Sequence, residues 1–292
     1  MNNMTALVSC FVRYYHTHNS RTKVYDDPLA EKLLSKAERS AIAENMKSGI
    51  SFFDPGYKGN DPLGRVVNGF LAPSVLARSA FCRQHLLNEI SLGAKQYVIP
   101  AAGYDTSGYG LNGGIRVFEL DRDEIVGDKI RRVEATGIDS TNISYICCDL
   151  SGDWLPALLG SGFDRDKKTF CSLLGLSFYL SQEDFCRTVC LLSENMPRGS
   201  AVVFDYPNDR ICEKESRNRA LAYEAGEEMR SRFSYADIGR IAHEAGLLIY
   251  EHIDSTDVDK TFFKAYNLTD TSEPLAAPEG VSYCLMVKYR QK

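Results

Sequence analysis

The chain has 292 residues, enough to bury one large core and to cover it with a smaller structure. Its net charge of −5 argues against a nucleic-acid-binding surface, which is normally basic. No apolar run is long enough to span a membrane, and the first residues lack the basic and apolar regions of a secretory signal. We therefore expect a cytoplasmic protein that binds neither nucleic acid nor membranes.

The nine cysteines do not predict a disulfide framework, because their number is odd and most lie inside apolar runs, as Cys147, Cys148 and Cys171 do. Buried free thiols in a reducing compartment are the expectation. Cys186 and Cys190 stand four apart on a predicted helix, but no second Cys or His pair with metal spacing accompanies them. No metal site is predicted.

The first 92 residues are predicted to be helical and irregular, and the pattern changes at Gln96. From there, short apolar and β-branched runs alternate with helical stretches, which predicts a mostly parallel sheet with right-handed crossovers and helices on both faces. The predicted strands are Gln96–Pro100, Ile115–Leu120, Ile143–Cys148, Thr169–Leu174 and Ser200–Asp205, and the predicted helices are Asp123–Ala135, Gln182–Asn195 and Asp209–Arg230.

The end of the chain has a different pattern. A capping box at Ser234 opens a predicted helix that stops at Gly246. Strands are predicted at Leu247–Ile253 and Ser282–Tyr289, as a terminal antiparallel hairpin added to the parallel sheet. The connection Asp254–Gly280 is predicted to be a long loop, either functional or disordered.

The turn after the first strand, Ala101–Thr106, is the first candidate binding element. The small residues Ala101, Ala102 and Gly103, followed by Asp105, would let the backbone approach a nucleotide, with the turn leading into a helix N-terminus. A dinucleotide fingerprint has three glycines where this turn has one, so a simple strand-to-helix turn is the alternative interpretation.

Further candidates follow the next two strands. Glu119 and Asp121 place two carboxylates on one face at the carboxyl end of the second strand, where a carboxylate can bind ribose hydroxyls. One of the pair could instead cap the helix that begins near Arg122. Asp149 and Leu150 close the third strand, where they could bracket an adenine ring. Open α/β sheets bind ligands at these carboxyl ends.

Residues Gly175–Tyr179 follow the fourth strand and resemble the nucleophile elbow G-x-S-x-G of hydrolases, with Ser177 as the nucleophile. The elbow requires a small residue at its last position because the turn is tight. Tyr179 is too large for that position, so the pattern disfavours a serine hydrolase.

Taken in order, these residues resemble the leucine carboxyl methyltransferase family, and more closely its bacterial small-molecule branch. The resemblance covers nearly the whole chain, and the spacing of the motifs makes it specific. Its elements are an N-terminal signature at Thr5–Ala6, Arg13 and Asp26–Ala30; Arg78, 18 positions before Gln96; Ala101–Thr106, similar to the turn G-A-G-x-D-T; Val117–Asp121 with Lys129, similar to F-E-x-D…K; and Gly175–Leu180, similar to E-G-x-x-x-Y-L.

The resemblance implies a class I methyltransferase with a Rossmann-like, mostly parallel seven-stranded sheet over residues 93–292. Residues 1–92 would form a helical cap that closes over the cofactor S-adenosylmethionine. On the family pattern, Arg78 would meet the methionine carboxylate and the turn around Gly103 the methionine moiety. Asp121 would bind the ribose, and Asp149 and Leu150 would flank the adenine.

Some positions depart from the family pattern. Ala101 replaces the first glycine of the turn, and Leu174 replaces the motif glutamate, which in the family helps to hold the cofactor. A catalytically inactive cofactor-binding protein is therefore an alternative. A nicotinamide-dependent oxidoreductase is another, although Tyr104–Thr106 stands where its third glycine is expected.

The methyl acceptor is predicted to be a small apolar or aromatic metabolite. A carboxylate acceptor needs no general base, and no His–carboxylate pair is evident near the strand ends; with the family's name activity, this favours carboxyl O-methylation. Protein C-terminal methylation is the second option. The pocket is expected between the cap and the sheet edge, with Tyr14, Tyr179 and Tyr206 as chief candidates and further aromatic candidates at Tyr15, Phe52, Phe53, Tyr57, Phe262 and Phe263.

Overall fold

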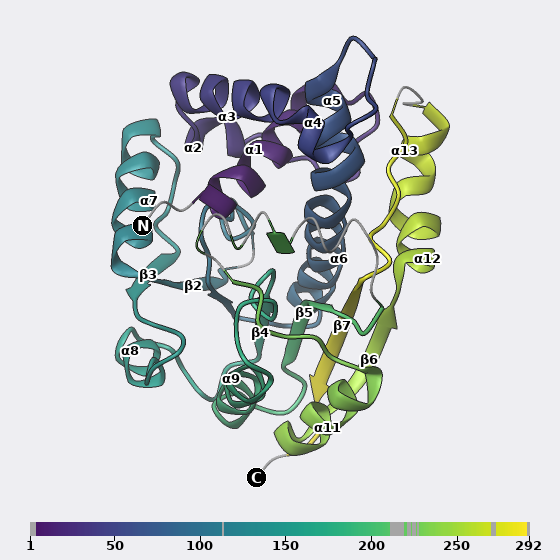
Figure 1. The fold of residues 1–292 in the computed structure, drawn as a ribbon. Helices are drawn as coiled ribbons and strands as arrows, with labels where there is room; N and C mark the ends of the chain where they lie inside the picture. The colour runs from purple at the N-terminus through teal and green to yellow at the C-terminus, as the bar shows by residue number, and fades with distance from the viewer. Residues whose placement is uncertain are drawn as a thin grey trace.

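A single seven-stranded sheet organises the protein in the computed structural model, which describes residues 4–112, 114–210, 219–220, 223, 226, 228–269 and 273–290. The strand order is β3-β2-β1-β4-β5-β7-β6, parallel from β3 to β5 and antiparallel at β7 and β6 (Figure 1). This confirms the predicted sheet with its antiparallel end. The strands are β1 Gln96–Pro100, β2 Arg116–Asp121, β3 Ile143–Cys147, β4 Thr169–Leu173, β5 Ala201–Pro207, β6 Leu247–Ile253 and β7 Val281–Lys288.

Both faces of the sheet are covered by helices, which explains why its central strands are buried along their whole length. Side chains alternate between two cores. Tyr97, Ile99 and Val117 pack on the side of the N-terminal helices α1 (Met4–Asn19) and α6 (Ala72–Ser91), whereas Val98 and Phe118 pack on the side of α8, α9 and α11. Helices α7 Asp123–Thr136, α8 Leu155–Gly160, α9 Gln182–Glu194 and α11 Tyr235–Ala245 follow strands β2, β3, β4 and β5 along the chain, in that order.

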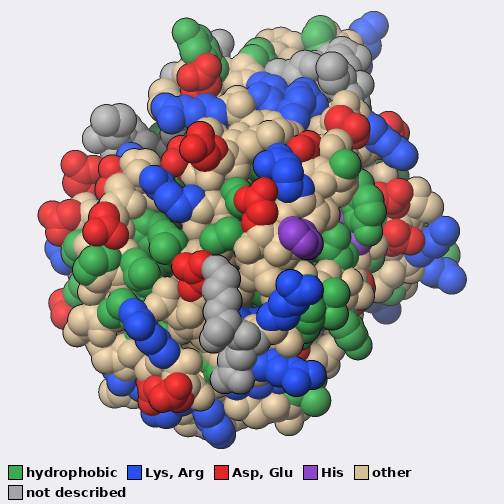
Figure 2. All heavy atoms as spheres, turned by 90° about the horizontal axis from the view of Figure 1, so that it is seen from below, with side chains coloured by type: hydrophobic (Ala, Val, Ile, Leu, Met, Phe, Trp, Pro, Cys, Tyr) green, Lys and Arg blue, Asp and Glu red, His purple; other side chains and the backbone are tan. Residues whose placement is uncertain are grey.

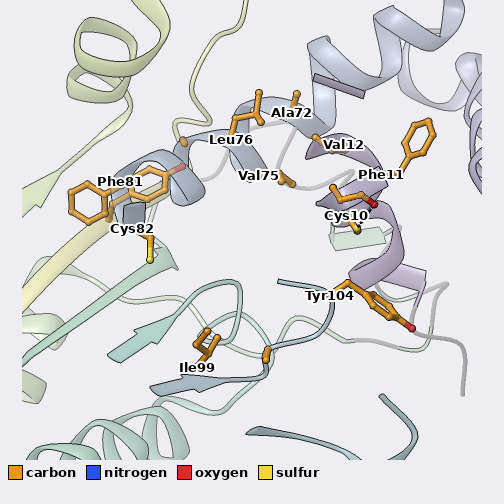
Figure 3. Close-up of a cluster of buried hydrophobic side chains, with 14 of the residues drawn as sticks. Cys10, Phe11, Val12, Ala72, Val75, Leu76, Phe81, Cys82, Ile99 and Tyr104 are labelled. Atoms are coloured by element: carbon orange, nitrogen blue, oxygen red, sulfur yellow. Dashed lines mark hydrogen bonds between the residues drawn. The ribbon is translucent and has the colours of Figure 1, made fainter. Parts of the chain in front are cut away.

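The N-terminal residues form a stack of helices above the carboxyl ends of the strands, at the top of Figure 1. The long helix α6 runs down from this stack and packs against β4, β5 and β7. Side chains of α1 and α6 belong to one buried cluster with Ile99 of β1 and with Tyr104, and Figure 3 shows the elements from which they come. The elements are α1 Met4–Asn19, α2 Ala30–Leu33, α3 Lys36–Ser48, α4 Ile50–Phe53, α5 Pro62–Val66, the π-helical turn η1 Val67–Leu71 and α6 Ala72–Ser91.

Local capping signals set the ends of several helices. The capping box predicted at Ser234 is present, with Asp237 as its partner, and α11 ends at Gly246 in the left-handed conformation (φ 64°). Ser181 caps α9 in a similar way by accepting from the backbone N–H of Asp184.

The connection between β6 and β7 was predicted to be a loop, and this was wrong. It forms α12 Ser255–Val258, the π-helical turn η2 Asp259–Phe263 and α13 Lys264–Thr269. Asp254 caps the first of these helices, and Phe263 and Tyr266 are buried in the core. The helix predicted at Asp209–Arg230 lies largely outside the described residues.

Two smaller expectations also differ from the structure. Residues 101–115 form turns, with no helix among the residues described there, so the tight turn after β1 does not lead into a helix. Cys147 is exposed rather than buried, because β3 is an edge strand of the sheet.

The surface carries no extended area of one charge on the face shown in Figure 2, where basic and acidic side chains are interspersed. None of the helices in the described parts of the chain is both long and apolar enough to cross a bilayer.

Candidate functional site

A cleft of about 420 Å³ opens at the carboxyl ends of β1 to β4, beneath α1. It is the place at which an open α/β sheet binds its ligand. The cleft brings together most of the residues predicted from the sequence, since its walls include Arg78, Ala101, Ala102, Gly103, Asp105, Asp121, Asp149, Leu150 and Leu174.

Asp121 organises the turn at the floor of this cleft. Its Oδ2 accepts a hydrogen bond from the backbone N–H of Gly103 at 2.7 Å, and its Oδ1 accepts one from that of Arg122 at 2.8 Å. Burial raises the pKa of Asp121, while these two N–H groups act against the rise. A Cβ at Gly103 would lie 3.2 Å from the Cβ of Ala6, so a side chain there would crowd α1 against the turn. Asp121 and Gly103 together fix the position of the backbone at the floor of the cleft.

Ala101 adopts a left-handed backbone conformation (φ 56°), which is uncommon for a residue with a side chain. The family pattern has glycine at this place in the turn. The methyl group of Ala101 is thus accommodated at some cost in backbone strain, of about 1 kcal/mol.

Glu119 does not line the cleft, contrary to the expectation that both carboxylates of β2 face a ligand. It lies deeper in the same face, fully buried, with its carboxylate 2.7 Å from Nζ of Lys129. Burial raises the pKa of Glu119 to about 7, opposed by Lys129. Lys129 also donates to the carbonyl oxygen of Asp105 at 2.6 Å. Glu119 therefore supports the turn from below, through Lys129.

Asp149 and Leu150 form the wall of the cleft after β3. The carboxylate of Asp149 accepts hydrogen bonds from the backbone N–H of Ser151 at 2.9 Å and from its hydroxyl at 2.7 Å. These bonds hold the pKa of Asp149 below its ordinary value. The loop presents one charged and one apolar side chain to the cleft.

Arg78 on α6 reaches the opposite end of the cleft, where it contacts both α1 and the sheet. Its Nη2 donates to the hydroxyl of Ser9 at 3.1 Å, and its Nη1 lies 3.7 Å from Oδ2 of Asp205. Asp205 is fully buried on β5, and its Oδ1 accepts from the backbone N–H of Gly175 at 2.6 Å. The sequence interpretation missed Asp205, although a carboxylate directly after an apolar run is the signal that identified Asp121 and Asp149.

A second cavity of about 400 Å³ adjoins the cleft under the N-terminal helices. The two share the wall formed by Thr5, Ser9, Arg78, Gly175 and Tyr179. Of the described residues that line this second cavity, Arg78 alone is charged. Most of the others are apolar and come from distant segments: Met4, Val8, Ile42, Met46, Phe53, Phe70, Leu71, Pro73, Val75, Phe178, Met229, Ala276, Pro278 and Val281.

The aromatic residues predicted to line the acceptor pocket are only partly placed there. Tyr179 lines both cavities and Phe53 lines the apolar one. Tyr14 lies on another side of α1, where its ring stacks with the guanidinium of Arg39. Tyr206 is buried in the core, with its hydroxyl 2.7 Å from Nε2 of His252. The other aromatic candidates outside the described walls are Tyr15, Phe52, Tyr57, Phe262 and Phe263.

Ser177, the residue of the elbow-like motif, is fully buried, and its hydroxyl donates to the carbonyl oxygen of Asp205 at 2.7 Å. This geometry agrees with the interpretation that disfavoured a hydrolase. No group of three or more His, Cys, Asp and Glu side chains in the described residues is arranged to hold a metal ion.

Comparison with known proteins gives a consistent result along the chain. A family model described as leucine carboxyl methyltransferase matches residues 6–191. YktD of Bacillus subtilis (strain 168), provisionally classed as an S-adenosyl-L-methionine-dependent methyltransferase, is 33% identical, with 98% of this chain and 98% of its own length covered. A protein of the same provisional class from Mycolicibacterium gilvum is 28% identical over 68% of this chain and 65% of its own length.

Solved structures share the fold at low sequence identity. A duf574 family protein from Streptomyces avermitilis has a TM-score of 0.58 at 15% identity, with 96% of this chain and 97% of that chain covered. Magnesium protoporphyrin IX methyltransferase from Synechocystis, solved with bound SAH, has a TM-score of 0.50 at 9% identity, with 86% and 100% covered. The predicted class I methyltransferase fold is confirmed.

Proposed function

The chain belongs to the leucine carboxyl methyltransferase family of S-adenosylmethionine-dependent methyltransferases, and we propose that it methylates a carboxyl group of a small apolar or aromatic metabolite. The observation that carries this proposal is the apolar cavity of about 400 Å³ that adjoins the polar cleft. Its volume lies in the range of pockets that bind small organic molecules.

The lining of the apolar cavity supports a carboxylate as the reacting group. A hydroxyl or ammonium acceptor must lose a proton before it attacks, whereas a carboxylate is already ionised at neutral pH. The described walls of the apolar cavity hold no Asp, Glu or His side chain to serve as a base.

The cleft fits S-adenosylmethionine. Asp121 at the end of β2 would hold the ribose, Asp149 and Leu150 would flank the adenine, and Arg78 would meet the methionine carboxylate. Gly175 leaves the room that this needs, because a Cβ there would lie 2.7 Å from Nη1 of Arg78. The cofactor, when bound, supplies a methyl group on a positively charged sulfur.

The protein's part in the transfer is proximity, orientation and exclusion of water, since the displacement at the methyl group is in line. Tyr179 and Gly175 belong to the wall shared by the two cavities, where the donor and the acceptor would meet. The helices above the sheet partly cover this junction, and the apolar walls of the second cavity would leave an acceptor carboxylate less solvated and therefore more reactive.

A catalytically inactive cofactor-binding protein is the second candidate. It is favoured by one observation, that Leu174 lines the cleft in the place of the family glutamate and brings no carboxylate to it. Turnover distinguishes the two candidates, since both bind the cofactor.

The test is an assay with methyl-labelled S-adenosylmethionine and a set of apolar and aromatic carboxylic acids, followed by mass spectrometry. We expect a labelled methyl ester that mild base hydrolyses back to the acid. A labelled product that resists mild base, as a methyl ether or methylamine does, would overturn carboxyl methylation. Binding of the cofactor with no labelled product from any acid would favour the inactive protein.

A further inference from the structure

A fully buried carboxylate lies directly beneath the junction of the two cavities. Asp205 ends the apolar part of β5 and sits opposite Tyr283 of β7 in the antiparallel register. Its Oδ1 accepts from Gly175, but neither its Oδ2 nor the hydroxyl of Tyr283 has a hydrogen-bond partner among the described residues. Buried carboxylate oxygens normally accept a hydrogen bond, so one without a hydrogen-bond partner beside a cleft calls for an explanation.

The nearest positive group to this oxygen is the guanidinium of Arg78, with Nη1 at 3.7 Å. A charge-assisted hydrogen bond has a length of about 2.8 Å, so a displacement of the guanidinium by about 1 Å would form one. Arg78 is held from the other side by Ser9 of α1. The guanidinium of Arg78 therefore lies between Ser9 of helix α1 and the carboxylate of Asp205 on β5.

The peptide of Gly175 is fixed by the same carboxylate. Gly175 has a left-handed conformation (φ 68°) and contributes to both cavities, and its N–H is directed at Oδ1 of Asp205 at 2.6 Å. Its lack of a side chain is what allows Arg78 to approach. One carboxylate therefore sets both the backbone turn after β4 and the arginine that packs on it.

We propose that Asp205 is a positioning residue, which orients Arg78 toward the methionine carboxylate of the cofactor. This inference rests on the cofactor of the proposed function. The family glutamate, whose place Leu174 takes, would bring a negative charge to the end of β4. In this chain the negative charge comes from the neighbouring strand β5 and acts through Arg78 instead of by direct contact, since Asp205 is fully buried.

The test compares two nucleosides by calorimetric titration of the full chain. S-Adenosylhomocysteine carries the amino-acid carboxylate, and 5′-methylthioadenosine lacks it. Asp205→Asn keeps an oxygen for the N–H of Gly175 and removes the charge that faces Arg78. We expect it to weaken S-adenosylhomocysteine binding at least tenfold and to change 5′-methylthioadenosine binding less than twofold. In an Arg78→Gln background, Asp205→Asn should have no further effect on S-adenosylhomocysteine.

Ser177→Ala is the matched control, because it removes a buried hydrogen bond to the same residue without altering the charge near Arg78. It should leave the ratio of the two affinities unchanged. If Asp205→Asn does not fold, Gly175→Ala provides the second test, since its methyl group would displace Arg78 directly and should produce the same selective loss.

Equal losses for both nucleosides in Asp205→Asn, or in Gly175→Ala, would show a merely structural role and overturn the inference. Wild-type protein that binds neither nucleoside would overturn the inference together with its cofactor. Selective loss without any labelled ester in the assay described above would retain the inference and reject carboxyl methylation, so the two failures are distinguishable.

Discussion

The polar cleft and the apolar cavity share a wall but are built in different ways. The floor of the cleft comes from residues that directly follow β1, β2, β3 and β4, so the topology of the sheet alone brings them together. The apolar cavity collects side chains from α1, α3, α4, η1 and α6 and from three later segments, at Phe178, at Met229 and between Ala276 and Val281. Under the proposed function, residues at strand ends would bind the cofactor, and the packing of the N-terminal helices would select the acceptor.

The cavity also depends on an irregular helix. The π-helical turn η1 joins α5 to α6 and places Gly69, Phe70 and Leu71 on the cavity wall. Such turns insert a residue into a helix and are frequent at functional sites. The cleft has its own irregularity in the left-handed Ala101, so each cavity owes part of its shape to a local departure from regular backbone.

Removing the carboxylate of Asp121 should weaken nucleoside binding in the cleft and leave ligand binding in the apolar cavity unchanged. Asp121→Ala leaves the N–H groups of Gly103 and Arg122 without their acceptor, and we expect S-adenosylhomocysteine binding to weaken about 100-fold by calorimetry. Binding of anilinonaphthalene sulfonate, an apolar anion suited to the cavity, should persist. Asp139→Ala, at an exposed carboxylate, should alter neither, and parallel loss of both ligands would contradict the separation of the two sites.

The ion pair between Glu38 and Arg132 holds a wall of the apolar cavity in place, because it joins α3 to α7. Arg132 donates to both carboxylate oxygens of Glu38, at 2.6 and 2.8 Å, and lowers the pKa of Glu38 to about 2. Since the folded pKa lies below the ordinary value of 4.5, the stabilisation is complete above pH 4.5 and is lost as the pH falls toward 2.

After allowance for solvent around this partly exposed pair, we expect the unfolding free energy to fall by about 1.5 kcal/mol between pH 6 and pH 3, measured by urea titration at the two pH values. Glu38→Gln should reduce the difference between the two pH values by about that amount. Glu44→Gln, on the exposed side of the same helix, is the control. An unchanged pH dependence in Glu38→Gln would rule out this pair as the acid-sensitive link.

A substitution that fills the apolar cavity should weaken ligand binding in that cavity and leave nucleoside binding in the cleft unchanged, which is the reverse of the effect expected for Asp121→Ala. Ser74 is half-buried on α6 and lines the apolar cavity but not the cleft. Ser74→Phe should weaken anilinonaphthalene sulfonate binding about tenfold, as the ring takes up part of the volume, with S-adenosylhomocysteine affinity unchanged within twofold. Ser91→Phe, at the exposed end of the same helix, should change neither affinity. Weaker binding of the nucleoside would show that the two spaces overlap more than their walls indicate.

The smallest expected effect is at the strained turn of the cleft. Ala101→Gly removes the cost of a left-handed alanine, and we expect a gain of about 0.5 kcal/mol in unfolding free energy, a rise of about 1 °C in Tm. Ala157→Gly, in an exposed position of α8, should instead destabilise by about 1 kcal/mol. A loss of stability in Ala101→Gly would mean that the packing of the methyl group outweighs the strain.

The difference between the two cavities also explains what the sequence could predict. Strands, capping boxes and the residues that follow strands are local signals, and they located Asp121, Asp149 and Leu150 correctly on one cleft. Depth within a face is not local, so Glu119 could not be told from Asp121 before its pairing with Lys129 was known.

Aromatic side chains gave less information. The sequence does not distinguish Tyr14, which lies outside the apolar cavity, from Tyr179, which lines it. The difference arises from the packing of α1 against its neighbours, which places Tyr14 beside Arg39. The helical connection after β6 was missed because its π-helical turn disturbs the regular helical spacing of apolar residues. Asp205 followed the recognisable strand-end pattern but stood outside the family motifs.

The shared wall makes the two ligands thermodynamically linked. Arg78 and Tyr179 line both the cleft and the apolar cavity, so a nucleoside bound in the cleft can change the affinity for the acceptor. The acceptor must then change the affinity for the nucleoside by the same factor. Acceptors can therefore be sought without any turnover, by screening compounds for a change in the dissociation constant of S-adenosylhomocysteine. A carboxylic acid that competes for Arg78 would raise that constant, and one that completes the wall at Tyr179 would lower it.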